Sequence, residues 1–499
     1  RMDPSRVPVI VGVGTVKDRP ADPTLALEPA ALMAEALRRA EADAGAKLLD
    51  RVDALDVVHQ VSWPYPDILG LLTGMLGIDP AHRYYGPVGG ETPVRYLHEA
   101  AQRIAEGRSQ VAAVVGGEAQ HAAAQAAKQG IALPWHPRDE TLPPRNRDYL
   151  ALLQRRVGLD MPIRVYPLYE NACQAAWGQT PQQGQAESAA LWSQYSEAAA
   201  RTEDAWLPRA VPPAEIATPG PANRMIAWPY PKLMTANPLV NQGAAVIVTS
   251  LAAARATGIP AARCIPILGG AAANEPKDTM ARPRFDMAPA QDVVLEAAVE
   301  IAGGDAGRFA LREFYSCFPC VPKMARRTLG LPEGTSPTVA GGLTFHGAPL
   351  NNYMLHAACA MVRRLREHPP GTLGLLYGQG GFVTNHRTLV LGGEAGAAPL
   401  VTRDLQTVAD ARREVPPELV EGRTGESRVE THTVVFRTDG TVDYGGVVLR
   451  LPDNTRSMAR VPREDATTLG VLMDPERSAV GHAGRLMPAA EGEVQTWQA

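Results

Sequence analysis

Short apolar runs and longer helical faces alternate along the chain. Val7–Val13 and Val111–Val115 are continuous apolar runs, which are typical of strands buried on both faces. Between them, Pro29 begins a helix that the pattern extends to about Gly45. The same alternation of strands and helices continues to residue 391, and it predicts an α/β protein.

The segment 84–120 carries the most specific pattern. The run Tyr84–Val88 leads into Gly89-Gly90, a helix follows, and Gly107 ends that helix before a buried strand. This order predicts a parallel βαβ unit. The free N–H groups at the start of such a helix suit an anion or a developing oxyanion. One face of the helix is apolar, at Val94, Leu97, Ala101 and Ile104.

The order of elements occurs twice, which predicts an internal duplication. One series begins at residue 7 and the other at residue 263, and both read strand, helix, strand, short helix, glycine turn, long helix, strand, strand. Residues 121–240 interrupt the first series. They are rich in Pro, Gln and Arg and are too numerous for a plain loop, so we expect an inserted subdomain there.

A different pattern begins at residue 396. Alternating segments are joined by turns such as Asp439-Gly440, which predicts a small antiparallel β-barrel or meander. The predicted units are a first half at 1–120 that 241–258 completes, the insertion at 121–240, a second half at 259–395, and the β domain at 396–499.

Composition and charge exclude several classes of protein. The 499 residues carry a formal net charge of −4, which gives no basic surface for nucleic acid. No apolar run approaches the roughly 20 residues that span a bilayer, and we expect neither membrane insertion nor a signal peptide. The 5 Cys residues show no disulfide framework and no zinc-ligand spacing. We therefore expect no metal and a cytoplasmic location.

The segment 84–120 resembles the nucleophile segment of the thiolase superfamily. In that family a Cys lies on the turn before the helix, and the following strand ends in Gly-Gly-x-Glu or a similar sequence. An ungapped alignment on Ile104, Gly107 and Glu118 places Gly90 at the position of that Cys. The resemblance implies a five-layered α/β fold of two halves, with residues 121–240 as its loop domain.

The C-terminal β domain resembles the additional module of the sterol-carrier-type thiolase relatives, which has an oligonucleotide-binding-type barrel. The family acts on acyl-CoA thioesters, so the resemblance implies coenzyme A or its thioester as substrate or ligand. It also places Arg224, Trp228 and Lys232 where the family's loop domain meets coenzyme A. Lone basic residues are more often merely solvated.

Two further loops of the family's active site carry candidate acid/base residues here. Tyr315 begins Tyr-Ser-Cys-Phe, at the position of a family Asn or His. Its hydroxyl can donate to an oxyanion, or remove a proton if its pKa is lowered. His346 begins His-Gly-Ala-Pro, two residues before Ala348, which takes the place of the family His. The alternative interpretation is structural for both side chains.

The fourth loop of the family corresponds to Tyr377–Gly381. The family Cys falls on Tyr377 or Gly378, so no acid/base thiol is present there. Gly380 can still supply an N–H group to an oxyanion, as can Gly90. The alternative for Gly90 is that it only permits a tight turn.

These observations leave several functions open. The chain is formally similar to acetyl-CoA acetyltransferases, but without a thiolate at Gly90 no acyl-enzyme can form there. The candidates are an acyl-CoA thioester-binding thiolase-like protein, a cysteine-independent carbon–carbon lyase of the retro-aldolase type, and a non-catalytic protein that binds coenzyme A or a partner. Thiolases dimerise through the strand before the nucleophile turn. Because Gly86 and Pro87 weaken that strand, we expect a monomer or a weak homodimer.

Overall fold

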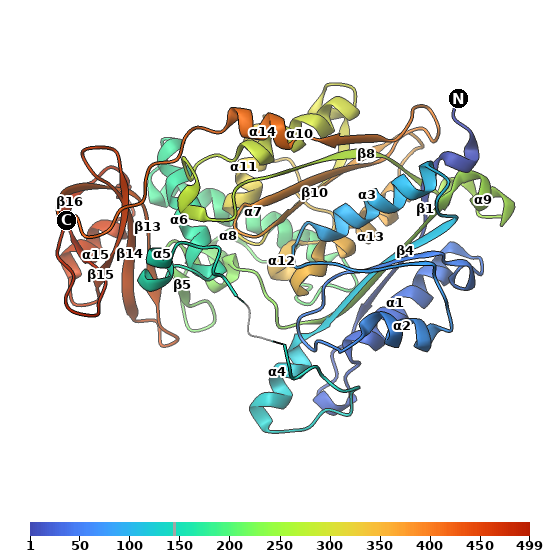
Figure 1. Cartoon of the computed structure of the whole chain (residues 1–499), viewed down its shortest axis with the longest axis horizontal. Coiled ribbons are helices and arrows are strands. Elements are labelled where there is room, and N and C mark those ends of the chain that lie inside the picture. Colours follow the sequence, from blue (N-terminus) through green and yellow to red (C-terminus); the bar gives the residue numbers. More distant parts are fainter. Residues whose placement is uncertain (143–145) are drawn as a thin grey trace.

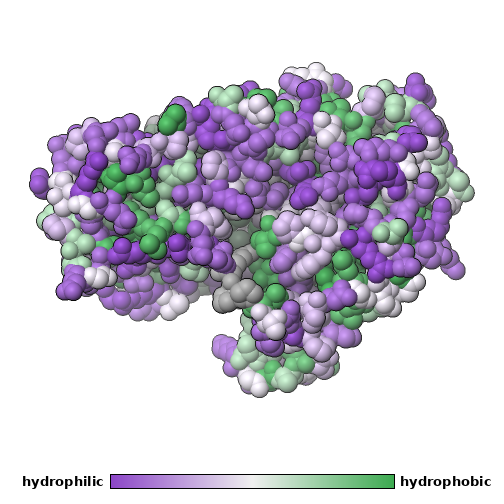
Figure 2. Space-filling view, viewed as in Figure 1, coloured by the Kyte–Doolittle hydropathy of each residue, from purple (hydrophilic) through white to green (hydrophobic). Residues whose placement is uncertain are grey.

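The computed structural model describes residues 1–142 and 146–499. No helix among these residues is long and apolar enough to cross a membrane. The face in Figure 2 is mostly hydrophilic, and its apolar side chains form small separate patches. Apolar side chains are instead buried in the core clusters between the layers of secondary structure.

The first half is a five-stranded part of a larger mixed sheet, in the order β3-β2-β4-β7-β1. Strands β3 and β4 are both parallel to β2, which lies between them. The expected parallel βαβ unit is therefore present, but its two strands are not neighbours. The elements are β1 (Pro8–Lys17), α1 (Pro29–Ala44), β2 (Ala54–Val57), α2 (Ile68–Leu76), β3 (His82–Tyr85), α3 (Thr92–Ala105), β4 (Val111–Ala119), β7 (Asn241–Ser250) and α9 (Leu251–Ala256).

The second half repeats this arrangement. Its order β8-β11-β10-β9 corresponds to β1-β7-β4-β2, and β1 pairs with β8 where the two halves meet. A further strand, β12, pairs with β8 and comes from beyond residue 395. The elements are β8 (Ile265–Asn274), α10 (Pro289–Ile301), β9 (Phe309–Phe314), α11 (Cys320–Thr328), α12 (Gly342–Phe345), α13 (Tyr353–Arg366), β10 (Leu373–Gly380), β11 (Asn385–Gly392), β12 (Val401–Asp404) and α14 (Gln406–Arg412).

The two halves stack into five layers (Figure 1). Helix α1 covers the outer face of the first half, and α10 covers the outer face of the second. Helices α3 and α13 touch each other and contact strands of both halves, so they form the middle layer. This position explains why α13 is buried almost throughout although it carries three arginines in its last turn. The expected five-layered architecture of two duplicated halves is confirmed.

The insertion is mainly helical. Its helix α6 packs on α11, and a fully buried ion pair of 2.7 Å joins Lys323 of α11 to Glu170 of α6. Such a pair fixes the orientation of the insertion, because separating its partners would leave a buried charge alone. The elements are α4 (Gln120–Gln129), α5 (Leu152–Val157), α6 (Pro162–Ala176), α7 (Pro181–Ala200), α8 (Pro213–Ala217), β5 (Met225–Ala227) and β6 (Tyr230–Pro231).

The C-terminal domain lies at one end of the molecule (Figure 1) and is an antiparallel sheet, as expected. Its order is β15-β14-β13-β16-β17, and β5 of the insertion joins β13. Within the described residues the edge strands meet at an isolated bridge between Arg460 and Thr496, so the sheet curls without closing into a barrel. The elements are β13 (Gly425–Phe436), β14 (Val442–Arg450), β15 (Arg456–Pro462), α15 (Ala466–Leu472), β16 (Ala483–Leu486) and β17 (Trp497–Gln498).

Candidate functional site

The turn before α3 is held by the other half of the molecule. The Gly89 N–H donates to the Asn351 side-chain oxygen at 2.9 Å, and Asn351 in turn donates to the carbonyl of His59 at 3.1 Å. Asn351 therefore links the turn before α3 to the segment that follows β2. The Gly89 carbonyl accepts from both the N–H and the hydroxyl of Thr92, which closes the turn against the first turn of the helix.

Gly90 lies directly against Tyr315. A β-carbon at Gly90 would be 2.8 Å from the phenol Cζ of Tyr315 and closer still to its oxygen. It would also be 2.5 Å from the backbone oxygen of Gln379. No side chain fits at this position without displacing a neighbour. The Gly90 N–H donates no hydrogen bond to any described residue, so it remains available to a ligand oxygen.

Tyr315 is placed by the end of β9. Its N–H donates to the carbonyl of Tyr377 at 3.0 Å, which ties it to β10. The residue is 7% exposed, and burial raises the pKa of its hydroxyl well above the usual value. The nearby Cys317 and Glu91 raise that pKa further. Tyr315 is therefore suited to donate a hydrogen bond, and the base role that required a lowered pKa is not supported.

Glu91 is a candidate that the sequence pattern did not single out. It follows Gly90, and its carboxyl lies beside Gly380, where a β-carbon would be 3.1 Å from the carboxyl carbon. One oxygen of the buried carboxyl has no hydrogen-bond partner in the described structure. Burial raises the pKa of Glu91 to about 7, although Arg387 and Arg95 oppose the shift. A carboxyl that titrates near neutral pH is suited to exchange a proton.

The fourth loop surrounds the same turn. Gly380 lacks the side chain that would collide with Glu91, so its glycine makes room for that carboxyl. Next to it, the amide of Gln379 donates to the hydroxyl of Tyr166 at 3.0 Å and to the sulfur of Cys317 at 3.6 Å. Burial raises the pKa of Cys317 to about 12, so the sulfur nearest the turn is a neutral thiol.

His346 belongs to a different neighbourhood from the Gly90 turn. Its Nδ1 is 3.1 Å from the carbonyl of Ala340, and its ring is 5.1 Å from the ring of His356. Burial lowers the pKa of His346 to about 4, which leaves the ring neutral at physiological pH. The ring of Tyr353 lies near those of both His346 and Tyr315. The structure thus brings Gly90, Tyr315 and Gly380 together. Within the described residues, His346 makes no hydrogen bond or ring contact with any of them.

The residues expected to meet coenzyme A lie at the junction with the C-terminal sheet. Arg224 donates to the backbone carbonyl of Arg437, and Trp228 donates its N–H to the carbonyl of Val434 at 2.9 Å. The Trp228 side chain packs against the core of the C-terminal domain. Lys232 is exposed. Arg224 and Trp228 are partly buried, so Lys232 is the most exposed of the three.

The described residues contain no evident metal-binding site. Across residues 1–142 and 146–499, no group of three or more His, Cys, Asp or Glu side chains could hold a metal ion. The five cysteines are all buried as free thiols. The turn offers the Tyr315 phenol, the Glu91 carboxyl and the Gly90 N–H, a set that can move a proton and hold an oxyanion.

Comparisons with known proteins support this architecture. Residues 404–490 match the family model described as the thiolase-like protein type 1 additional C-terminal domain. No curated protein sequence is significantly similar to the chain. The crystal structure of a monomeric SCP2-thiolase like protein type 1 from Mycobacterium smegmatis superposes with a TM-score of 0.83, at 26% identity over 100% of both chains.

More distant structures share the fold. An Ltp2-ChsH2(DUF35) aldolase matches with a TM-score of 0.56 at 17% identity, over 78% of this chain and 98% of that one. The Acat5 thiolase from Ascaris suum in complex with coenzyme A gives a TM-score of 0.54 at 15% identity, over 78% and 100%. The fold, the domain match at residues 404–490 and the full-length similarity together support a thiolase-like protein with an additional C-terminal domain.

Proposed function

We propose that the chain binds an acyl-CoA thioester and cleaves a carbon–carbon bond beside the thioester carbonyl without a cysteine nucleophile. One observation carries the proposal: the Tyr315 hydroxyl and the Glu91 carboxyl both lie at the Gly90 turn, where a thiolase places its thiol. A retro-aldol reaction needs a base and donors for an oxyanion, and this turn offers both.

The steps balance with this chain's own groups. The Glu91 carboxylate removes the proton of a β-hydroxyl, the bond between the α- and β-carbons breaks, and the β-carbon becomes a carbonyl. The electron pair passes to the thioester as an enolate, whose oxygen is held by the Gly90 N–H and the Tyr315 hydroxyl. The protonated Glu91 then returns its proton to the α-carbon. A pKa of about 7 suits Glu91 both to remove the proton and to return it.

The distant relatives support the substrate class. An aldolase shares this fold, and so does a thiolase whose structure was determined in complex with coenzyme A. We place the nucleotide end of the ligand near the insertion, where Lys232 is an exposed cation. Arg224 and Trp228 would support the β5–β6 hairpin beside that end of the ligand. The cytoplasmic location stays a prediction.

A second candidate function is a non-catalytic acyl-CoA-binding protein. The burial of Tyr315 favours it, because the hydroxyl fills the space that a reacting group would need. Formal acetyl-CoA acetyltransferase activity has the least support, since no thiol stands at the turn to accept an acyl group.

Ligand binding and turnover together test the proposal. We expect coenzyme A thioesters to raise the melting temperature, and β-hydroxyacyl-CoA to be cleaved. Glu91→Gln and Tyr315→Phe should each slow cleavage by roughly two orders of magnitude. Tyr353→Phe is the matched control, because the Tyr353 hydroxyl donates its proton to Glu313 at 2.9 Å. If thioesters bind but are not cleaved, the non-catalytic binding function remains and the lyase function is excluded. If no thioester binds, both proposed functions are excluded.

A further inference from the structure

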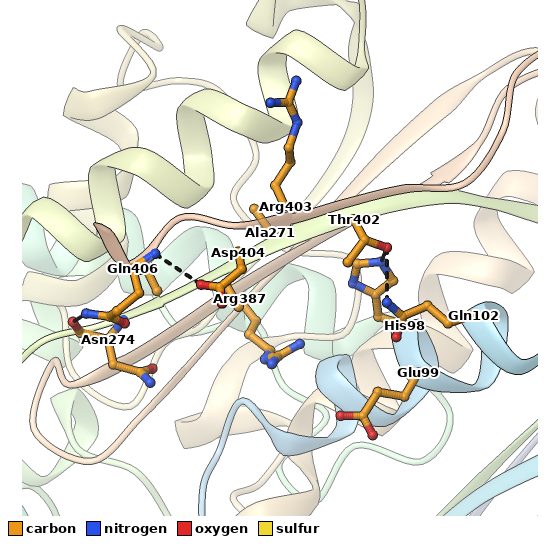
Figure 3. Close-up of a pocket in the computed structure, with 12 residues that line it drawn as sticks. His98, Glu99, Gln102, Ala271, Asn274, Arg387, Thr402, Arg403, Asp404 and Gln406 are labelled. Carbon is orange, nitrogen blue, oxygen red and sulfur yellow. Dashed lines mark hydrogen bonds between the residues drawn. The ribbon is translucent and has the colours of Figure 1, made fainter. Parts of the chain in front are cut away.

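A cavity of about 390 Å³ lies between α3 and the second half of the sheet. Figure 3 shows its walls: His98 and Gln102 reach in from α3, Arg387 from β11, and Thr402 and Asp404 from β12. This volume is within the range of small-molecule pockets. Gly90, Glu91 and Tyr315 do not line this cavity.

The strand register explains why space remains here. Arg387 is paired with Ala272 across β11 and β8, and Asp404 is paired with the same alanine across β12 and β8. The three side chains therefore form one row across the sheet, with the smallest in the middle. A single methyl group at Ala272 leaves a trough between the guanidinium and the carboxylate.

Arg387 is the main donor in this cavity. Its guanidinium makes no hydrogen bond and no ion pair within the described structure, although burial lowers its pKa. Glu99 is close by, but it is paired with Arg95 at 2.6 Å. A guanidinium that is partly withdrawn from water normally has partners for its five N–H groups. Arg387 therefore has donors that only a ligand or solvent can use.

Thr402 supplies a second donor. Its hydroxyl oxygen accepts from the amide of Gln102 at 3.1 Å and lies 3.1 Å from Nε2 of His98. Nε2 of His98 also lies 3.1 Å from the carbonyl of Val401, which can only accept, so that nitrogen carries a proton. Both neighbours thus act as donors toward Thr402, and the proton of its own hydroxyl is not used by another described residue.

We propose that this cavity binds a small organic monocarboxylate. The planar fork of Arg387 matches the two oxygens of a carboxylate, and the Thr402 hydroxyl provides a further hydrogen bond. The organic part would lie over Ala272. One negative charge suits the site better than two, because Glu91, Glu99 and Asp404 already face Arg387. A phosphate dianion would add more charge than one guanidinium balances.

Calorimetry with the full-length protein tests this site. Acetate, butyrate and benzoate are titrated in a buffer without carboxylates, with inorganic phosphate as a separate arm. We expect at least one carboxylate to bind the unmodified protein, and Arg387→Gln to weaken that binding about tenfold or more. Ala272→Leu keeps the guanidinium but fills the trough, and it should also prevent binding.

Arg403→Gln is the matched control, because the Arg403 side chain points away from Arg387 in Figure 3 and pairs with Glu300 at 3.8 Å. We expect this variant to bind like the unmodified protein. Circular dichroism confirms that each variant is folded. The proposal is overturned if no carboxylate binds, if Arg387→Gln and Ala272→Leu bind as well as the unmodified protein, or if phosphate binds more tightly than every carboxylate.

Discussion

The phenol of Tyr315 occupies the space in which a side chain at position 90 would lie. An added β-carbon there would be 2.8 Å from the Tyr315 Cζ atom, well inside normal contact distance. The two residues thus depend on each other: glycine makes room for the phenol, and the phenol closes the turn. A nucleophile could not be restored at this turn by a single substitution at position 90.

The first prediction concerns this contact. Gly90→Ala should lower the free energy of unfolding by roughly 1–3 kcal/mol, because the new methyl group overpacks a buried site. Adding Tyr315→Phe should restore only part of the loss, since the backbone oxygen of Gln379 remains 2.5 Å away. Urea denaturation measures both effects.

The matched control for this prediction is Gly74→Ala in α2. A β-carbon at Gly74 would meet no atom within 4 Å, and the exposed helical site should gain about 0.5–1 kcal/mol from the change. Equal stability of Gly90→Ala and the unmodified protein would show that the close contact does not exist in solution.

Much of the fold could be predicted from the sequence, because both halves carry uninterrupted hydrophobic periods. The order of the elements predicted the duplication, and the strand orders of the two halves confirm it. Long-range pairing could not be predicted in the same way. The insertion of β2 between β3 and β4, and the pairing of β5 with β13, depend on segments far apart in the chain.

The candidate site could be predicted only in part. The resemblance placed Gly90, Tyr315 and Gly380 around one centre, and the structure brings them together. Glu91 escaped notice because a carboxylate at a helix start is normally stabilised by the helix dipole. Here burial outweighs that effect and raises its pKa, and this burial arises from parts of the chain that meet only in the folded state.

The second prediction is a pH-dependent stability that Glu91 contributes. Its pKa is about 7 in the folded protein and near the ordinary 4.5 when unfolded. Between these values the folded state keeps a proton that the unfolded chain has lost, so the free energy of unfolding falls as pH rises. Glu91→Gln removes this contribution, and its unfolding free energy should fall less between about pH 4.5 and 7.

Two other buried carboxyl groups also contribute to the pH dependence of stability. Burial also raises the pKa values of Glu118 and Glu313 to about 7. Some pH dependence must therefore remain in Glu91→Gln. Urea denaturation over this pH range measures the slope, and an unchanged slope in the variant would mean that Glu91 titrates normally in the folded protein.

The third prediction concerns thiol chemistry. All five cysteines are buried, and burial raises the pKa of each thiol, so none is a ready nucleophile. We expect thiol-directed reagents to react slowly with the folded protein and at full stoichiometry after denaturation. Mass spectrometry after incubation with acyl-CoA should find no acyl adduct on any cysteine, and a trapped acyl-cysteine would contradict the proposed mechanism.

The last prediction concerns assembly through β3. This strand is at the edge of the sheet, where pairing with a second copy would have to occur. The N–H of the following Gly86 already donates to Val57 at 3.2 Å, and Pro87 has no N–H to donate. Arg83 on the strand forms an ion pair with Asp79, and Nε2 of His82 lies 3.0 Å from a carboxylate oxygen of Asp56.

Charged side chains and a proline just beyond the end of the strand both hinder edge-to-edge pairing. We therefore expect a monomer in multi-angle light scattering at micromolar concentrations. Pro87→Val restores one donor but leaves Arg83 and His82 in place, so it should remain monomeric. The prediction is wrong if the unmodified protein forms a tight dimer and Arg83→Glu makes it monomeric. That result would show that β3 pairs with a second copy despite its charged side chains.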